Sequence, residues 1–419
     1  MQTPLPSGFI SELESLIPDE AEECIAALEQ APATSVKLNI RKCDDPSILG
    51  YGELERVKWC DTGYYLPQRP KFTLNPLLHA GVFYVQDASS MIYETIMKGL
   101  IPMTFDTSLT PAIADLCAAP GGKTTSLINA VPDGVFLLAN EFTPQRAGAL
   151  KENILKWGYP EIMVTNSPIS KLAEAGAAFD VVAVDAPCSG EGMMRKEEIA
   201  RSQWSEGLID QCVKLQREIL DDACRMLKPG GFLIYSTCTF NRREDEEQVK
   251  WLVENHGMAP FDPGFPEDWG IMRGIDTPYP CFRFMPHHTR GEGLFVAVMR
   301  KETDEYENTV PLPKLKEWLQ KNIKVIADGI PTEEKKGRDM VPTSVSALAT
   351  DFKKGRYPEI EVDEATALSY LRHEALRFGP EIEKGFTVIK FKGFPLGFVK
   401  NIGSRANNMY PAEWRIRNL

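Results

Sequence analysis

Residues Ile113–Thr125, IADLCAAPGGKTT, join a short apolar run to a loop of small residues that leads into a helix-like segment. Four more apolar runs follow, with room for a helix between them: VFLLANE (135–141), IMVTN (162–166), FDVVAVDA (179–186) and GFLIYSTC (231–238). Apolar strands that alternate with helices are typical of a parallel sheet covered on both faces. The pattern therefore predicts an α/β fold centred on this sheet.

Sequence on either side of this pattern extends the predicted organisation. The runs PCFRFMP (280–286) and GLFVAVMRK (293–301) alternate like strands and predict an antiparallel hairpin at the edge of the sheet. A chain of 419 residues is also too long for one ordinary core. We expect an N-terminal domain over 1–105, the α/β domain over 106–302, a linker and first C-terminal domain over 303–365, and a basic C-terminal domain over 366–419.

Composition indicates an ordinary globular protein of the cytoplasm. No apolar run approaches the roughly 18 residues of a membrane span, and the N-terminus has no secretory signal pattern. The nine cysteines are scattered and form no C-x-x-C or Cys/His cluster, so we expect reduced thiols and no metal site.

The net charge of −12 is unevenly distributed along the chain. Residues 1–30 contain seven acids and no Lys or Arg, whereas residues 384–419 contain seven Lys or Arg against Glu413 alone. The basic tail is able to meet a phosphate backbone, although a solvated basic surface explains the same counts.

The loop after the first strand is a candidate cofactor site, because ligands of open α/β sheets bind beyond the carboxyl ends of the strands. Its small residues Ala118, Ala119, Gly121 and Gly122 allow a ligand to approach the backbone closely. The next strand ends in Glu141, which is placed to accept hydrogen bonds from ribose hydroxyls. The loop is neither G-x-G-x-x-G nor a P-loop, and a tight turn with an unrelated helix-capping glutamate remains an alternative.

Two cysteines, Cys188 in VDAPCSGEG (184–192) and Cys238 in IYSTCTF (234–240), each follow a predicted strand. Both thiols are therefore expected to face one crevice, together with Asp185. A single cysteine is more often a small buried apolar residue, but two beside a carboxylate at one sheet edge favour chemistry. One chemistry that this residue set fits, although composition and spacing alone do not select it, is thiolate addition to carbon-6 of cytosine, which activates carbon-5 for methylation while a nearby acid stabilises the resulting charge.

At these residues the sequence resembles the Sun-type family of RNA cytosine-C5 methyltransferases, and most of all its bacterial RsmF-like 16S ribosomal RNA enzymes. The matching stretches are DLCAAPGGKTT, VDAPCSGEGMMRK, LQREILDDACRMLKPGGFLIYSTCTFN and MPHHTRGEGLFVAVMRK, with further likeness in the flanking segments. The resemblance implies a Rossmann-like methyltransferase sheet, an N-terminal α+β extension and a small C-terminal PUA-like RNA-binding domain. It also implies S-adenosylmethionine as the methyl donor.

The resemblance also implies roles for individual residues. The cofactor is expected on Cys117, Ala118, Ala119, Pro120, Gly121, Gly122 and Lys123, with Glu141 on its ribose and Asp185 near its reactive end. The acid that the family often places after the third strand is missing, so Asn166 or Ser167 must substitute near the adenine. Cys238 matches the nucleophile, and Cys188 matches the cysteine linked to product release.

Several alternatives remain open at this stage. DNA cytosine-C5 methyltransferases use the Pro-Cys cysteine as nucleophile, which would make Cys188 the attacking thiol. Lys123 either hydrogen-bonds near the reacting centre or caps a helix, and Arg195 and Lys196 either face a substrate phosphate or form a surface pair. The expected partner is ribosomal RNA or the small ribosomal subunit, bound by a monomer. A related enzyme acting on transfer RNA, another RNA or DNA, and a non-catalytic assembly factor, are the competing functions.

Overall fold

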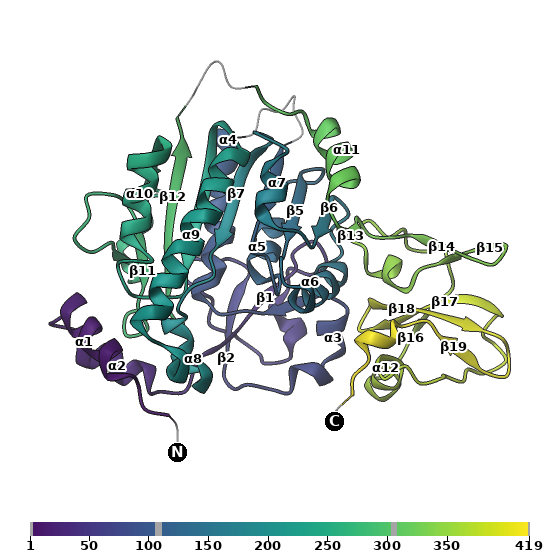
Figure 1. Cartoon of the computed structure of the whole chain (residues 1–419). Coiled ribbons are helices and arrows are strands. Elements are labelled where there is room, and N and C mark those ends of the chain that lie inside the picture. The colour runs from purple at the N-terminus through teal and green to yellow at the C-terminus, as the bar shows by residue number, and fades with distance from the viewer. Residues whose placement is uncertain (1–2, 105–110, 303–307, 418–419) are drawn as a thin grey trace.

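The computed structural model describes residues 3–104, 111–302 and 308–417. Within these residues the centre of the molecule is a ten-stranded mixed sheet with the order β10-β11-β12-β8-β7-β4-β5-β6-β13, and β9 pairs with β12 (Figure 1). Its parallel strands are β4 (Ala112–Asp115), β5 (Phe136–Asn140), β6 (Ile162–Thr165), β7 (Phe179–Asp185) and β8 (Leu227–Thr237). All five predicted strands are therefore confirmed, as is their parallel pairing.

The parallel strands are apolar throughout because both faces of the sheet are covered. Successive residues of β7 alternate between two cores: Val181 and Ala183 pack on one face, Val182 and Val184 on the other. The first core is covered by α4 (Ile92–Thr104), α5 (Gly122–Ala130) and α6 (Pro144–Trp157). The second is covered by α7 (Ile169–Ala173), α9 (Glu206–Met226), α10 (Glu246–His256) and α11 (Leu312–Asn322).

Antiparallel strands extend the sheet at both edges. On one side β12 (Leu294–Lys301) pairs with β8, and β11 (Phe282–Phe284) pairs with β12, which confirms the predicted hairpin. The short strands β9 (Met258–Phe261) and β10 (Met272–Arg273) complete this side. On the other side β13 (Val325–Asp328) pairs antiparallel with β6. No sequence pattern predicted β13, which is short, only half-buried and interrupted by a bulge between Val325 and Ala327.

The N-terminal segment supplies a helical pair and a small sheet. The pair is α1 (Ser7–Leu16) and α2 (Ala21–Leu28), and the sheet has the order β2-β1-β3, built from β1 (Thr34–Leu38), β2 (Gly63–Leu66) and β3 (Phe83–Val85), with α3 (Pro76–His79) beside it. The helical pair packs on Met194, Phe240 and Met285 of the α/β part. The N-terminal residues are thus joined to the elements that surround the candidate site.

The C-terminal segment folds around a four-stranded sheet with the order β16-β17-β18-β19. Its elements are β16 (Glu359–Glu361), α12 (Glu364–Leu371), β17 (Gly385–Phe391), β18 (Phe394–Asn401) and β19 (Ala406–Asn408), preceded by the hairpin β14 (Glu333–Lys336) and β15 (Asp339–Pro342). Tyr370, Ile389 and Tyr410 share one core with Val36 and Leu77 of the N-terminal segment. The C-terminal sheet therefore packs against β1 and α3 of the N-terminal segment.

The aromatic residues of the C-terminal segment are partly core: Phe391, Phe398 and Tyr410 are buried, whereas Phe394 and Trp414 are half-buried. Among the described residues, no helix is both long and apolar enough to cross a membrane. The predicted domain boundaries near 105 and 303 fall on residues outside the described ranges, and they stay predictions.

Candidate active site

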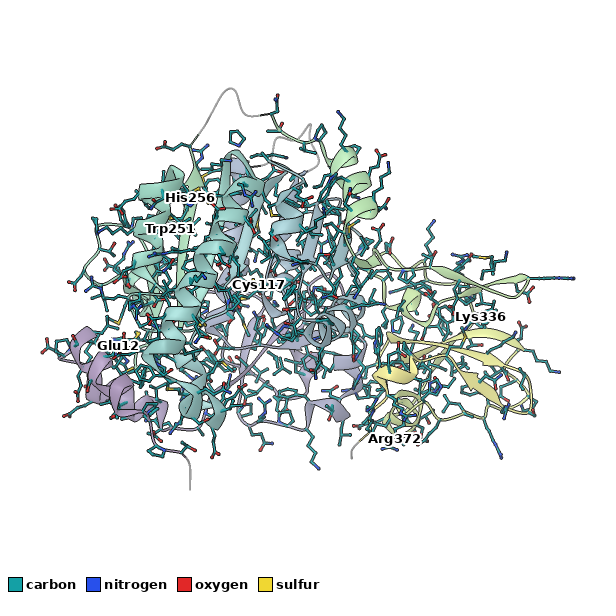
Figure 2. All side chains as sticks on the ribbon, viewed as in Figure 1. Glu12, Cys117, Trp251, His256, Lys336 and Arg372 are labelled. Atoms are coloured by element: carbon teal, nitrogen blue, oxygen red, sulfur yellow. The ribbon has the colours of Figure 1, made fainter. Side chains whose placement is uncertain are left out.

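The candidate site lies where the strand order reverses, since β4 has β5 on one side and β7 on the other. This is the place where open α/β sheets bind ligands. Cys117 follows β4 and is labelled near the centre of the molecule in Figure 2. Asp185 ends β7, and Cys238 follows β8. The structure thus brings these three predicted residues to the same edge of the sheet.

The two predicted thiols are in direct contact, with 3.3 Å between Cys188 Sγ and Cys238 Sγ. The hydrogen bond with Cys238 and burial raise the pKa of Cys188 well above its ordinary value. Cys188 therefore keeps its proton at neutral pH, and either sulfur is able to donate the hydrogen bond between them. Such a bond stabilises whichever sulfur is ionised, so the choice of Cys238 as nucleophile stays a prediction.

The Asp185 carboxylate is held through both of its oxygens. Lys123 Nζ lies 2.8 Å from Oδ2, and the Ser236 hydroxyl donates to Oδ1 over 2.7 Å. Burial lowers the pKa of Lys123, but the charge and hydrogen bond of Asp185, together with the charges of Cys238 and Asp87, outweigh this effect and hold that pKa above its ordinary value. Lys123 is therefore a buried cation paired with Asp185 and close enough to Cys238 for their charges to interact. This placement favours a site role for Lys123 over helix capping.

Two residues of this cluster were missed in the sequence. Ser236 lies two residues before Cys238, where alternation along β8 points it to the same side as Cys238, so the motif contained a usable signal. Tyr93 of α4 exchanges a 2.9 Å hydrogen bond with the Ser236 hydroxyl and faces the Lys123 ammonium with its ring. Tyr93 is separated from Ser236 by 143 residues, and no local pattern marked it.

Buried carboxylates hold the two cysteine loops against each other. Glu191, from the Cys188 loop, accepts hydrogen bonds from the backbone of Phe240 (2.6 Å) and Asn241 (3.0 Å) and from the Trp204 indole (2.9 Å). In return Glu244, just beyond Cys238, accepts from the backbone of Ser189 over 3.0 Å.

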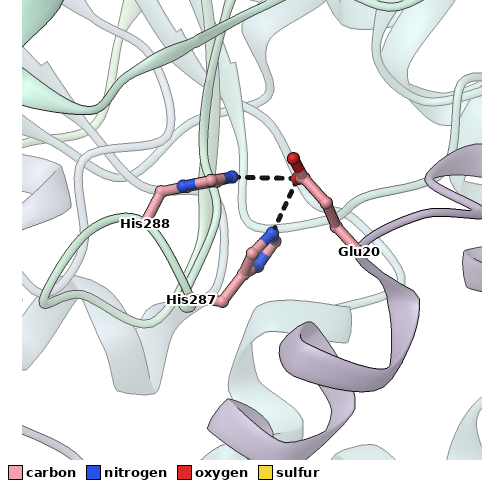
Figure 3. A group of neighbouring side chains, drawn as sticks. All are labelled: Glu20, His287 and His288. Carbon is pink, nitrogen blue, oxygen red and sulfur yellow. Dashed lines mark hydrogen bonds and ion pairs between the residues drawn. The ribbon is translucent and has the colours of Figure 1, made fainter.

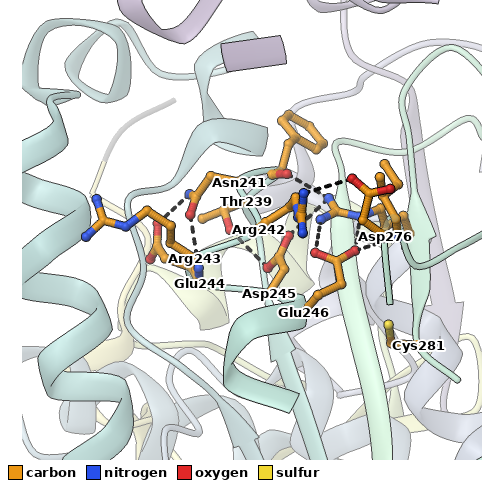
Figure 4. A network of polar contacts seen from close by, with 12 residues as sticks. Thr239, Asn241, Arg242, Arg243, Glu244, Asp245, Glu246, Asp276 and Cys281 are labelled. Atoms are coloured by element: carbon orange, nitrogen blue, oxygen red, sulfur yellow. Dashed lines mark hydrogen bonds and ion pairs between the residues drawn. The ribbon is translucent and has the colours of Figure 1, made fainter. Parts of the chain in front are cut away.

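This second carboxylate belongs to a larger polar network. Asn241 and Gln216 also donate to Glu244, at 2.7 and 2.8 Å, and Figure 4 shows Asn241 and Glu244 beside the neighbouring acids Asp245 and Glu246. The close approach of the loops also explains Gly192, where an added Cβ would lie 2.9 Å from Glu292 O and 3.1 Å from Cys238 O. The relative position of the thiols is therefore fixed by packing and by buried hydrogen bonds.

A hollow of about 750 Å³ opens beside this cluster, beyond the ends of β4 and β5. Of the predicted cofactor residues, Cys117 and Glu141 line it. Burial raises the pKa of Cys117 well above its ordinary value, so this residue is a neutral part of the wall. Further lining residues that the sequence analysis missed are Leu116, Phe142, Thr143, Arg146, Pro168, Ile169, Ser170, Pro187, Leu215, Glu218, Ile219, Asp221 and Asp222. A hollow with apolar wall residues and the Glu141 carboxylate at the end of β5 fits a nucleoside, and three further acids, Glu218, Asp221 and Asp222, line the side formed by α9.

The other predicted cofactor residues occupy supporting positions around this hollow. Ala118 and Ala119 are buried, the φ of 112° at Gly121 requires a glycine, and Gly122 begins α5. The Pro120 carbonyl accepts from Asn153 over 2.8 Å.

Asn166 does not line the hollow. Its amide donates to the carbonyls of Glu141 and Phe142, both at 2.8 Å, and its side-chain oxygen accepts from Lys324. Asn166 therefore stabilises the backbone turn at Glu141 and Phe142.

The pair Arg195 and Lys196 is engaged within the protein. Arg195 donates to the carbonyls of Gln30, Ala31 and Gly291, and Lys196 forms a 3.2 Å ion pair with Glu292. Both residues also line a hollow of about 490 Å³ against the N-terminal sheet, together with Arg69 and Asp87. Arg195 therefore ties segments together, and a phosphate contact by either residue stays a prediction.

Comparison with known families identifies three consecutive parts of the chain. Residues 103–300 match the 16S rRNA methyltransferase RsmB/F model, residues 5–88 the N-terminal domain of 16S rRNA methyltransferase RsmF, and residues 357–416 the methyltransferase RsmF PUA domain. The ribosomal RNA small subunit methyltransferases F of Enterobacter sp. and Cronobacter sakazakii are 28% and 29% identical, over 97% and 98% of this chain and 95% and 96% of theirs.

Solved structures support the same fold. A methyltransferase homolog from Pyrococcus horikoshii is similar with a TM-score of 0.59 and 24% identity, over 70% of this chain and 93% of that one. NSun6 from Pyrococcus horikoshii, determined with the S-adenosylmethionine analogue SFG, is similar with a TM-score of 0.60 and 19% identity, over 71% and 99%. Fold and family matches together define an S-adenosylmethionine-dependent RNA methyltransferase. Within that class, the chain belongs to the RsmF family of 16S ribosomal RNA methyltransferases.

Proposed function

We propose that this protein methylates carbon-5 of a cytosine in 16S ribosomal RNA through a covalent bond between Cys238 and carbon-6. The observation that carries the proposal is the contact of two thiols, 3.3 Å apart, beside a carboxylate held by Lys123 and Ser236. A methyltransferase acting on a ring nitrogen, an exocyclic amine or a ribose hydroxyl has no use for a thiol pair. Carbon-5 of cytosine needs one, because it becomes nucleophilic only after addition to carbon-6.

The first step is addition of the Cys238 sulfur to carbon-6, which places the electron pair of the carbon-5–carbon-6 bond at carbon-5 and into the ring. Asp185 accepts the proton that the attacking Cys238 thiol gives up and shares it with ring N3, where the negative charge collects. Lys123 and Ser236 hold Asp185 in this orientation before the base arrives. Preorganised polar groups of this kind supply much of the stabilisation in enzyme active sites.

S-adenosylmethionine held in the hollow would supply an electrophilic methyl group to carbon-5. We assign its ribose to Glu141 and its other contacts to Cys117 and the backbone from Ala118 to Lys123. Phe142 and Ile169 are better placed for the adenine than Asn166, because they line the hollow and Asn166 lies behind the Glu141 turn.

The last step is removal of the carbon-5 proton and expulsion of Cys238. We assign this release to Cys188, whose sulfur contacts the leaving sulfur. Cys188 donates its proton to the departing Cys238 sulfur and accepts the carbon-5 proton in its place, while the N3 proton returns to Asp185, and this elimination restores the aromatic ring. Cys188 is well suited to this late role because its raised pKa keeps it protonated, and therefore unreactive, during the attack.

We assign RNA binding to the surfaces around this crevice, including the C-terminal domain that matches the PUA model. The hollow of about 490 Å³ lined by Arg69 and Lys196 offers one path for the substrate strand. A cytosine in folded RNA must leave its stack to reach Cys238. We propose that the protein acts in the cytoplasm as a monomer, on ribosomal RNA or on the small subunit. We also propose domain boundaries near residues 105, 302 and 365.

The deciding experiment is nucleoside analysis of 16S ribosomal RNA after incubation with the protein and methyl-labelled S-adenosylmethionine. We expect the label in 5-methylcytidine, with transfer RNA and DNA unlabelled. Label in transfer RNA alone would show that the protein is a related methyltransferase whose substrate is transfer RNA. Absence of label in every RNA would favour a non-catalytic assembly factor, and label in any nucleoside other than 5-methylcytidine would refute the proposed chemistry.

A further inference from the structure

Two adjacent histidines on the β11–β12 loop face the N-terminal helical pair. Figure 3 shows His287 and His288 pointing toward Glu20, the residue that precedes α2. The Nε2 atoms of His287 and His288 lie 3.1 and 2.9 Å from the same Glu20 Oε2 atom. All three potential ligand atoms lie within 4.8 Å of one another, although 267 residues separate Glu20 from His287.

These separations are close to those of ligands on a zinc ion. Bonds of about 2.0–2.1 Å in a tetrahedral site place neighbouring ligand atoms about 3.4 Å apart. The Glu20 oxygen therefore needs to withdraw from the two nitrogens by only a few tenths of an ångström. The side chains of Glu20 and His288 are 38% and 35% exposed, so both are free to make that adjustment. The same exposure leaves a fourth position open to water.

The electrostatic surroundings favour a cation. Glu20 belongs to the N-terminal stretch of thirty residues that contains seven acids and no Lys or Arg. Glu23, on the same helix, also interacts electrostatically with His287. Two imidazoles and one carboxylate form a donor set that zinc commonly takes in proteins.

We propose that Glu20, His287 and His288 bind one zinc ion, which fastens α2 to the β11–β12 loop. Because no Cys/His cluster is present, the sequence predicted no metal site. His287 and His288 have no zinc-motif spacing, and Glu20 is brought to them only by the fold. Nδ1 of His287 is buried and has no hydrogen-bond partner in the described part of the chain. Metal-binding histidines usually anchor this second nitrogen, so the site binds zinc more weakly than a closed Cys/His site.

The loop fastened in this way borders the thiol crevice. Downstream of His288, the Gly291 carbonyl accepts a 3.1 Å hydrogen bond from Arg195, and the backbone of Glu292 donates to Asp87. The Glu292 and Gly293 carbonyls leave no space for a Cβ at Gly192, next to the Cys238 carbonyl. The metal thus holds the wall of the crevice in position without touching the reacting atoms. This role is separate from the proposed methylation and holds whichever RNA is the substrate.

The test is zinc binding to the full-length protein after removal of bound metal with a chelator. Titration calorimetry and metal analysis are expected to give one zinc per chain and a higher melting temperature with zinc. Glu20→Gln and His288→Ala are expected to weaken binding by about 100-fold or more, because even neighbours of metal ligands change affinity by about 10–100-fold. In Glu20→Gln the amide oxygen still accepts hydrogen bonds from both rings, so folding is retained. Glu174→Gln, a change of an exposed residue outside this cluster, is the matched control and binds zinc like the wild type.

The thiol pair is the competing zinc site, and a Cys188→Ser/Cys238→Ser double variant separates the two. We expect this variant to retain one zinc and the zinc-dependent rise in melting temperature. Loss of zinc in the double variant with full binding in Glu20→Gln would place the metal on the thiols and overturn the proposal. Failure of the wild type to bind zinc at an excess of free metal would also overturn it, and would leave Glu20 as a hydrogen-bond acceptor for two histidines.

Discussion

In the two cysteine loops, the donors that face Glu191 and Glu244 are satisfied by these buried carboxylates. In the neighbouring hollow, by contrast, Phe142 is 64% exposed, and among the described residues the Glu141 carboxylate accepts one backbone hydrogen bond, from Thr143, and forms a 3.5 Å ion pair with Arg146. The thiol side is thus fixed before any substrate arrives, whereas the cofactor side keeps groups available for a ligand. The difference separates changes that slow the chemistry from changes that weaken cofactor binding.

The largest effect on activity is expected at Asp185, which lies beside the thiols and acts at the cytosine ring. Asp185→Asn removes the proton-sharing group and the charge that holds Lys123, while it preserves shape. We expect kcat to fall about 10⁴-fold, the upper range for loss of a positioned acid–base group. Single-turnover methylation measures this effect, and Asp210→Asn, which changes an exposed residue, is the control. A raised KM for S-adenosylmethionine with an unchanged kcat would mean that Asp185 serves the cofactor instead.

Glu191 tests whether the thiol side is held by its buried carboxylates. Glu191→Ala leaves the Phe240 and Asn241 backbone donors and the Trp204 indole unpaired. We expect the free energy of unfolding to fall by about 3 kcal/mol, because each unpaired buried donor costs about 1–3 kcal/mol and part of the site relaxes. Denaturant unfolding checks this, with exposed Glu197→Ala as control. An unchanged unfolding curve would contradict the account of how the loops are held.

Glu141 tests the cofactor side. Glu141→Gln weakens one charged hydrogen bond to a ribose, and the KM for S-adenosylmethionine is expected to rise about 10-fold. The kcat should change little, because no contact with the thiols is lost. Steady-state kinetics with varied cofactor measures both constants, and the exposed residue change Glu174→Gln serves as control. A fall in kcat at saturating cofactor would remove the distinction between the two sides.

Lys37 gives the smallest effect and concerns the support beneath the cofactor loop. Its ammonium group bonds to Gly122 O and Thr125 of α5, and burial lowers its pKa to about 7. The unfolded chain, with a lysine pKa near 10.4, binds more protons above pH 7, so stability rises with pH in this range. We expect a contribution of about 1 kcal/mol per pH unit between pH 7 and 8.5, lost in Lys37→Met. Denaturant unfolding at several pH values measures it, and equal slopes for both proteins would refute it.

The sequence predicted the sheet and the chemically active ends of its strands because both depend on local patterns. Asp185, Cys188 and Cys238 directly follow apolar runs, and strand ends gather at one edge of a parallel sheet. Tyr93, Glu191 and Glu244 were not predicted as site residues because their roles depend on contacts across the chain. A buried glutamate is identical in sequence to an exposed one, and only the fold shows which donors it meets.

The measurement that tests the central claim most directly is a denaturing gel of thiol variants incubated with 16S ribosomal RNA and S-adenosylmethionine. In our account Cys238 attacks and Cys188 releases. Cys188→Ala is therefore expected to accumulate a slowly migrating protein–RNA adduct that survives denaturation, while Cys238→Ala forms none and transfers no methyl group. An adduct formed by Cys238→Ala and abolished by the additional change Cys188→Ala would reverse the two roles and contradict the account.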